Sequence, residues 1–157
     1  NNNNNNNNPS NNADGTGKSK YVIASLPLQL TFVKPRMEAA NLKLGIEHLA
    51  WSGDGRFVAS SEASLPHVIW IWDLRRMELC ALLQHLTPVQ SLAWAPQGST
   101  LIAVCGSARV YLWSPGGASV VHVPLPKFRV FTCEWNATGT SILLGDRDTY
   151  CCAYLTS

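Results

Sequence analysis

The hydrophobic and polar positions change character at Tyr21. From there onward, short apolar or alternating runs are separated by Gly, Pro, Ser and Asp, and no stretch shows the apolar stripe of about 3.6-residue period that marks an amphipathic helix. Residues 68–72 and 101–104 are continuous apolar runs, which we expect to be inner strands covered on both faces. The pattern predicts an all-β fold.

A motif of apolar residues, Trp and a turn ending in Gly recurs three times. The tryptophans of the three copies, Trp51, Trp94 and Trp135, are separated by 43 and 41 residues, within the range of about 40 to 45 expected for a four-stranded propeller blade. Each copy is followed by an aromatic strand that ends in Trp72-Asp73, Trp113-Ser114 or Tyr154-Leu155. The offset from Trp94 to Trp113 equals that from Trp135 to Tyr154, 19 residues, so we expect these two copies to align without a gap.

These motifs resemble the WD-repeat family over about residues 28–155, with Trp72-Asp73 as the name-giving dipeptide. The resemblance implies three blades of an all-β WD-repeat propeller, the C-terminal part of a ring of seven or more blades. Three blades cannot close a ring by themselves, so we expect about four further blades upstream. The repeat signature residues are Trp51, Trp72, Asp73, Trp94, Trp113 and Trp135.

The chain divides into three parts. Residues 1–20 open with eight Asn and contain no large apolar side chain, which predicts a disordered low-complexity segment. Residues 21–45 are expected to be a connecting segment with the outer strand of a preceding blade. Residues 46–157 are expected to form the three blades, with limits at about 46–87, 88–128 and 129–157.

Composition narrows the functional classes. Charged residues make up 14% of the chain, and the 12 basic and 10 acidic side chains are scattered along it, so no basic stripe indicates nucleic-acid binding. No apolar run reaches the roughly 20 residues needed to span a bilayer, which favours a soluble intracellular protein. We expect the five cysteines to be buried, reduced thiols in strands.

No cluster of residues indicates catalysis, a metal or a cofactor. The four histidines, His48, His67, His85 and His122, lack Cys or carboxylate neighbours at metal-ligand spacing. His85 stands where the WD-repeat family carries its Gly-His dipeptide, and we expect it to be a structural histidine with its hydrogen bonds satisfied. No nucleophile elbow or carboxylate pair is present, so the sequence predicts a protein that is not an enzyme and binds no small-molecule substrate.

The first repeat is two residues longer than the others between its second and third strands. We expect residues 61–67 to project as a loop with an apolar tip, and Ser64, Leu65, Pro66 and His67 are the candidate partner-contact residues because loops on rigid scaffolds carry binding. A length variant without a function is the alternative.

A closer resemblance lies in residues 33–35, 41–46 and 49–52, in Leu65-Pro66 before the strand at 68–73, and in residues 111–117 and 121–124. Together they are similar to a subfamily of centrosomal and spindle-pole WD-repeat proteins, whose vertebrate gene lies antisense to a gene of the p53 tumour-suppressor family. That resemblance implies a cytoplasmic scaffold of the cytoskeleton. It would join a coiled-coil partner, and in some lineages a minus-end-directed kinesin, to anchor microtubule minus ends and support spindle, basal-body or cilium assembly. The alternative is a generic WD-repeat adaptor, such as a substrate receptor of a ubiquitin ligase.

Overall fold

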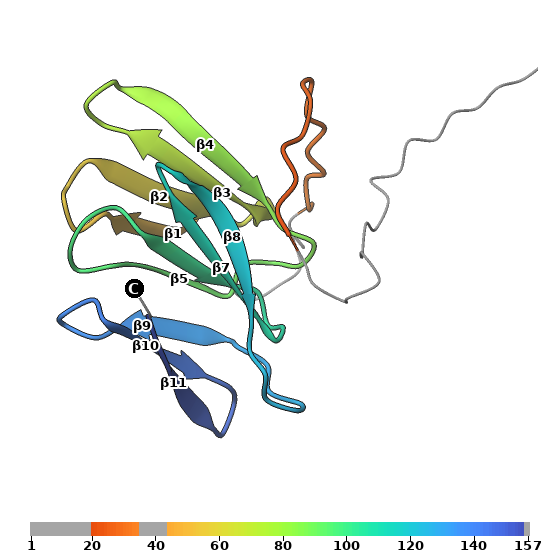
Figure 1. Cartoon of the computed structure of the whole chain (residues 1–157). Coiled ribbons are helices and arrows are strands. Elements are labelled where there is room, and N and C mark those ends of the chain that lie inside the picture. The colour runs from red at the N-terminus through yellow and green to blue at the C-terminus, as the bar shows by residue number, and fades with distance from the viewer. Residues whose placement is uncertain (1–19, 35–43, 156–157) are drawn as a thin grey trace, which may run out of the picture.

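A computed structural model describes residues 20–34 and 44–155, and in these ranges the chain forms eleven strands and no helix. The strands make three antiparallel sheets, which Figure 1 shows one beside the next. The first sheet holds β1 (Ile46–Trp51), β2 (Phe57–Glu62), β3 (Leu65–Asp73) and β4 (Glu78–Gln84) in chain order. The second holds β5 (Ser91–Trp94), β6 (Leu101–Val104), β7 (Arg109–Ser114) and β8 (Gly117–His122), and the third holds β9 (Thr132–Trp135), β10 (Ser141–Gly145) and β11 (Tyr150–Tyr154).

The inner strands carry the core, as their apolar runs predict. Every residue of β6 is buried, and so are the first five residues of β2. The fourth strands of the first two sheets, β4 and β8, are largely exposed. Of the predicted inner run at residues 68–72, Val68, Ile69 and Ile71 are buried whereas Trp72 is not. The burial therefore decreases from the middle of each sheet to its outer edge.

Glycines fix the turn between the first and second strands of each sheet. Gly55, Gly98 and Gly139 have φ angles of 68°, 77° and 72°, in the left-handed region where a side chain is strained. Gly53 meets a different demand, because a Cβ there would lie 2.4 Å from the carbonyl oxygen of Pro96 in the next sheet. The turn motif thus serves the hairpin and also allows adjacent sheets to approach closely.

Two apolar clusters hold the sheets together face to face. Between the first and second sheets, the ring of Phe57 stacks on Trp94 with centroids 6.3 Å apart and meets the edge of Trp113 at 5.4 Å. The second cluster joins residues of β6 and β7 to residues of β9 and β10, including Cys133 and Leu144. The hydrophobic core therefore consists of two separate layers of side chains, one between the first and second sheets and one between the second and third sheets.

The third sheet corrects the predicted alignment of the last two repeats. Trp113 pairs with Leu101 in the second sheet, but Ile142, the counterpart of Leu101, pairs with Ala153. Four residues, 146–149, separate the last paired positions of β10 and β11, whereas five, 105–109, separate those of β6 and β7. The shorter turn shifts β11 by one position, so Ala153 takes the place of Trp113. Tyr154 points to the other face and is 76% exposed.

Because the strands alternate in direction, all connections lie on two rims of the molecule. We call one the crossover rim: it contains the turns β2–β3, β6–β7 and β10–β11 and the links between sheets, residues 85–90 and 123–131. The opposite rim, which we call the hairpin rim, contains the turns β1–β2, β3–β4, β5–β6, β7–β8 and β9–β10. The blade limits predicted near residues 87 and 128 fall in the two links of the crossover rim.

Residues 20–34 run along the crossover rim (Figure 1). The backbone N–H of Val33 donates a hydrogen bond to the carbonyl oxygen of Ser64 at 2.8 Å. The described residues 20–34 include no strand, so the outer strand predicted between 21 and 45 is not found in them. The rest of that prediction, at 35–43, and the disordered segment predicted at 1–20, except Lys20, lie outside the described residues.

Candidate protein-binding surface

At each of the two junctions between sheets, one signature tryptophan forms a hydrogen bond to the preceding sheet. The indole Nε1 of Trp94 donates to the carbonyl oxygen of Ala50 at 3.0 Å, and that of Trp135 donates to the carbonyl oxygen of Ala93 at 3.2 Å. Each acceptor is the residue directly before the equivalent tryptophan of the preceding sheet, Trp51 for the first bond and Trp94 for the second. The same bond is thus made at both junctions, and it sets the position of one sheet on the next.

The outer face of the first sheet is built like the buried face of the second. Trp51, Val58 and Trp72 pair across β1, β2 and β3 as Trp94, Leu101 and Trp113 pair across β5, β6 and β7. Trp94 and Trp113 are 8% and 6% exposed, whereas Trp51 and Trp72 are 63% and 41% exposed. The first sheet therefore presents to solvent an apolar surface that, in the second sheet, is an interface between sheets.

Asp73 is a turn-forming residue on the hairpin rim. Its Oδ2 accepts from Nε and Nη2 of Arg56 at 3.2 and 2.8 Å, and its Oδ1 accepts the backbone N–H groups of Arg75 and Arg76. These hydrogen bonds, the one from the Arg56 side chain first, hold the pKa of the Asp73 carboxyl below its ordinary value. The name-giving aspartate thus closes the β3–β4 turn and ties it to the β1–β2 turn.

His85 lies in an aromatic pocket that the sequence does not predict. Tyr21 Oη and His85 Nε2 are 2.8 Å apart, and the rings of Tyr21, His85 and Tyr111 meet edge to face with centroids 4.7 to 5.9 Å apart. Burial lowers the pKa of His85 to about 4 and raises the pKa of the Tyr21 hydroxyl. His85 Nδ1 is buried without a hydrogen-bond partner. The expectation that this histidine has its hydrogen bonds satisfied is therefore wrong for one of its two nitrogens.

The predicted contact loop is also corrected by the structure. Strands β2 and β3 continue to a tight turn at residues 63–64, so Leu65, Pro66 and His67 belong to β3. Leu65 is 2% exposed, and the carbonyl oxygens of Ser64, Pro66 and His67 accept backbone N–H groups of Val33, Val89 and His85. The two extra residues lengthen a hairpin in place of forming a projecting loop, because the neighbouring segments satisfy its backbone groups.

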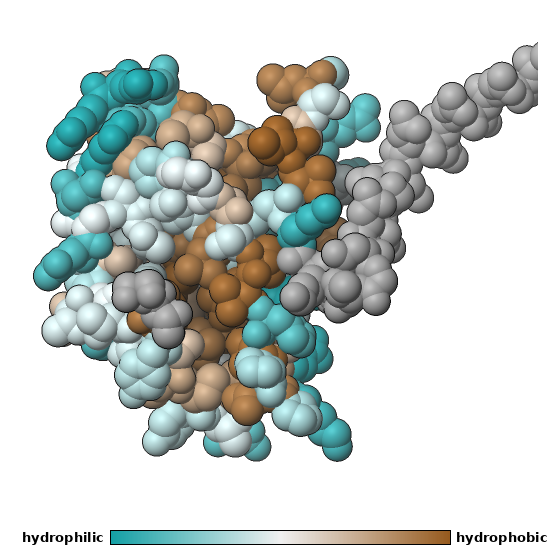
Figure 2. Space-filling model, in the orientation of Figure 1, coloured by the Kyte–Doolittle hydropathy of each residue, from teal (hydrophilic) through white to brown (hydrophobic). Residues whose placement is uncertain are grey.

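The apolar surface on this rim comes from residues 20–34 instead. Exposed large apolar side chains gather on this segment, as Figure 2 shows at the upper right. They are Val22, Ile23, Leu26, Phe32 and Val33. Such contiguous exposed apolar groups mark interaction sites more often than isolated ones do.

Four cations collect on the crossover rim although they are scattered in the sequence. Arg109, Lys127 and Arg129 line one surface pocket together with Ser107 and His122. The guanidinium carbons of Arg129 and Arg147 lie 5.9 and 5.4 Å from the centroid of the Phe131 ring. The fold thus forms a basic strip across the second and third sheets, which we call the rim cations: Arg109, Lys127, Arg129 and Arg147.

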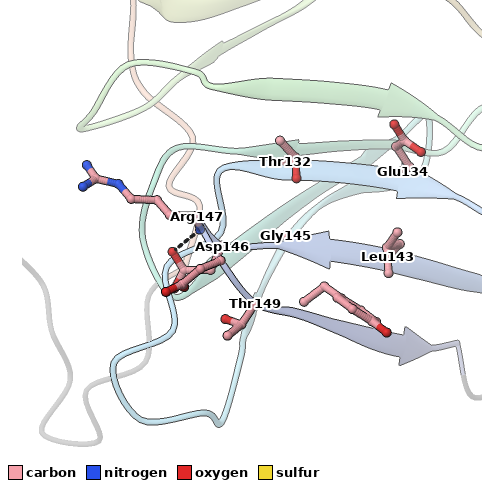
Figure 3. A pocket seen from close by; sticks show the side chains of 9 residues that line it. Thr132, Glu134, Leu143, Gly145, Asp146, Arg147 and Thr149 are labelled. Carbon is pink, nitrogen blue, oxygen red and sulfur yellow. Dashed lines mark hydrogen bonds between the residues drawn. The ribbon is translucent and has the colours of Figure 1, made fainter.

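A second, mixed pocket lies on the outer face of the third sheet (Figure 3). Thr132, Glu134, Leu143 and Tyr150 line it on the strands, and the β10–β11 turn closes one end. In that turn Asp146 accepts the backbone N–H groups of Arg129 and Arg147 at 2.9 and 2.7 Å, which lowers the pKa of its carboxyl. The side chain of Arg147 points away from this pocket (Figure 3). The turn is consequently ordered by its aspartate, and its arginine stays on the rim.

The cysteines only partly match expectation. All five are free thiols, and Cys105 and Cys133 are buried, but Cys80 and Cys152 are exposed. Burial raises the pKa of Cys105 to about 12 and that of Cys133 to about 11. Cys80 lies on the fourth strand of its sheet, and Cys152 faces outward on β11, where no further described strand covers it.

The described residues hold neither a metal-binding cluster nor a membrane-spanning helix. Residues 20–34 and 44–155 hold no group of three His, Cys, Asp or Glu side chains placed to bind a metal ion. Within the same ranges no helix is long and apolar enough to cross a membrane.

Comparison with known proteins decides the family. The model of the WD domain, G-beta repeat, matches residues 40–73 and 77–114. The chain is 40% identical over 141 residues to WD repeat-containing protein WRAP73 of Mus musculus, an alignment that covers 89% of this chain and 30% of that protein. This chain belongs to the WD-repeat family. Its three sheets are WD blades, and the all-β propeller fold predicted from the repeat spacing is confirmed.

One more distant relative agrees with this assignment, and one solved structure agrees with the fold. The guanine nucleotide-binding protein subunit beta-1 of Caenorhabditis briggsae is 25% identical over 120 residues, which cover 76% of this chain and 34% of that protein. A chain in the crystal structure of the mitotic checkpoint complex superimposes with a TM-score of 0.52 at 16% identity, over 73% of this chain and 36% of that chain. The WD chain thus spans about a third of the length of each protein that it matches.

The sequence motifs identified the interblade tryptophans but not their partners. The acceptor carbonyls follow only from the spatial offset between sheets, and Tyr21 is 64 residues away from His85 in the sequence. His48 was also not singled out, yet its Nδ1 lies 2.7 Å from Ser61 Oγ and its Nε2 lies 3.3 Å from the carbonyl oxygen of Gln90 in the next blade link. The spacing of equivalent positions in successive repeats is the signal that could have indicated such contacts.

Proposed function

We propose that this chain is part of a non-catalytic WD-repeat scaffold that acts at the centrosome or spindle pole, in microtubule minus-end anchoring and in spindle, basal-body or cilium assembly. The observation that carries the proposal is the 40% identity to WD repeat-containing protein WRAP73, which extends over 89% of the chain. This likeness includes the segment before the first blade as well as the blades, and so goes beyond what a generic repeat would give.

The geometry supports binding in place of catalysis. The rigid part of the molecule is a stack of β-sheets fixed by indole-to-carbonyl bonds, and its two rims display turns and links. The perturbed ionisable groups are explained by packing: His85 is buried against Tyr21 and Tyr111, and the carboxylates of Asp73 and Asp146 accept backbone N–H groups. Burial and hydrogen bonds within the fold account for each of these pKa shifts, so none of the shifts requires a catalytic role.

The expected partners are a coiled-coil protein of the spindle pole and, in some lineages, a minus-end-directed kinesin. The exposed apolar groups of residues 20–34 and the rim cations lie on the same rim, which offers a partner both apolar and charged contacts. Interfaces with an apolar centre and a polar border are typical of protein recognition.

Affinity purification of the tagged full-length protein from dividing cells, followed by mass spectrometry at mild salt, tests this function. A tagged WD propeller of another family, expressed at the same level, is the control for proteins that bind any propeller. Enrichment of a coiled-coil spindle-pole protein or of a minus-end kinesin is the expected result. Enrichment of cullin-type ligase subunits without any spindle-pole protein would contradict it and support a ubiquitin-ligase adaptor instead.

A further inference from the structure

The crossover rim contains a pocket with four positively charged or ionisable side chains and few neutralising partners. Arg109, His122, Lys127 and Arg129 line it, and Phe128 is a buried part of its lining. Arg109 and His122 are paired positions at the ends of β7 and β8, so the sheet register sets them side by side. Among the described residues, neither Arg109 nor Lys127 makes an ion pair. The positive charge of the pocket is therefore available to a ligand.

A polar atom within the pocket lining points to the same ligand class. Ser107 lines the pocket, and its Oγ is buried without a hydrogen-bond partner. A buried hydroxyl without a partner destabilises the folded chain, so such atoms are rare unless a ligand or water supplies the missing hydrogen bond. Rotation of the Ser107 side chain toward the pocket would let its Oγ donate to an anionic oxygen that the guanidinium or ammonium groups also hold.

The basic surface extends beyond the pocket toward the third blade. Arg129 Nε donates to the carbonyl oxygen of Gly106 at 2.9 Å, which fixes this guanidinium near Phe131. Arg147 approaches the same ring. Asp146 and Asp148 also lie on this rim, but Asp146 already accepts two backbone N–H groups. The rim cations thus form a short strip, broken by acidic side chains in the β10–β11 turn.

We propose that the pocket of Ser107, Arg109, His122, Lys127 and Arg129 binds carboxylate side chains of an acidic peptide segment in a protein partner. The strip favours a peptide over nucleic acid for two reasons. It is too short for a phosphodiester track, which needs a longer row of evenly spaced cations. Phe131, the aromatic ring on the strip, faces two guanidinium groups in place of a stacked base. The site deepens the proposed scaffold function and rests on it for its biological partner.

The test is fluorescence anisotropy of the 157-residue chain with a labelled Glu-rich peptide, and with the same peptide carrying Gln for Glu. The Glu-rich peptide is expected to bind and the Gln peptide to lose most of the affinity. Affinity should fall steeply as the salt rises from about 50 to 200 mM, because the contacts are charged. Arg109→Gln and Lys127→Gln are each expected to weaken binding about three- to tenfold. Arg75→Gln, an exposed arginine on the hairpin rim, is the matched control and should leave binding unchanged.

Ser107→Ala separates a ligand-binding role from a structural one. If Ser107 Oγ contacts the ligand, the substitution weakens binding about threefold without lowering the urea midpoint of unfolding, because the hydroxyl has no partner in the free chain. Three results would each overturn the proposal. The first is equal binding of the Glu-rich and Gln peptides, and the second is unchanged affinity in Arg109→Gln, Lys127→Gln and Ser107→Ala alike. The third is competition by single-stranded RNA at a concentration equal to that of the peptide. Since the purified chain and a synthetic peptide are used, this result does not depend on whether the protein acts at the spindle pole.

Discussion

Replacing Trp94 and Trp51 by Ala gives a matched test of the interblade architecture. Both tryptophans end the first strand of a blade, but Trp94 is 8% exposed and Trp51 is 63% exposed. A buried Trp removes roughly 200 Å² from water. At about 25 cal/mol per Å², Trp94→Ala is expected to lower the free energy of unfolding by about 4.5 kcal/mol. By the same scaling Trp51→Ala costs about 2 kcal/mol. Both figures are upper bounds.

The indole hydrogen bond widens this difference. Trp94→Ala also leaves the carbonyl of Ala50 without its indole donor, which costs about 1 kcal/mol more. Urea unfolding of the 157-residue chain, followed by far-UV circular dichroism, measures both variants without depending on tryptophan fluorescence. Trp94→Phe keeps a ring against Phe57 and Trp113 and gives a measurable intermediate if the Ala variant does not fold. Equal losses at the two positions, or a larger loss for Trp51→Ala, would refute the assignment of Trp94 as an interblade residue.

Three further predictions concern buried ionisable groups and turns. The pKa of His85 is lowered to about 4 in the folded chain, so the unfolded chain binds more protons between about pH 4 and 6.5. The neutral, buried His85 therefore contributes fully to stability above pH 6.5. This contribution, about 3 kcal/mol at most, is lost as the pH falls to about 4. The urea midpoint of unfolding should decrease as the pH is lowered from about 6.5 to 4, and this decrease should be smaller in His85→Leu. An equal decrease in His85→Leu and in the original chain would contradict a buried neutral histidine. Maleimide should label Cys80 and Cys152 in the native chain well before Cys105 and Cys133. Mass spectrometry of digested samples measures the extent of labelling at each cysteine. Early labelling of Cys105 would count against the core between the first two blades. Hydrogen bonds from Ser52 and Ser99 lower the pKa of Asp54 to about 2, so its stabilising effect is present above about pH 4 and lost toward pH 2; Asp54→Asn should reduce the drop in urea midpoint between pH 4 and 2.

The repeat spacing was sufficient to predict the blades because each blade is specified locally. Trp, a Gly turn and an aromatic strand recur at nearly constant intervals, and the resulting hairpins need only short-range pairing. The one-residue shift of β11 escaped prediction because Tyr154 looks like a copy of Trp113 in the sequence. The turn at residues 146–149 is one residue shorter and moves Ala153 into the equivalent position. Loop length, which the sequence leaves ambiguous, decided the register.

Contacts between blades and between distant segments could not be predicted in the same way. The extra residues before Val68 suggested a projecting loop, but Val33 and Val89 donate to its carbonyl groups and keep it in the hairpin. The charges looked scattered because Arg109 and Arg147 each lie 18 residues away from the neighbouring pair Lys127 and Arg129 in the sequence. The alternating strand directions return each of them to the crossover rim. Such juxtapositions depend on the packing of whole sheets, and they join positions that are not equivalent in successive repeats, so the repeat spacing gives no signal for them.

The most direct test of the proposed function is fluorescence imaging of the endogenously tagged full-length protein through mitosis, with a marker for spindle poles. A spindle-pole scaffold is expected to give a focus at both poles that persists through metaphase, together with a signal at basal bodies in ciliated cells. A diffuse signal, or one confined to another compartment at every stage, would contradict the assignment as a spindle-pole scaffold.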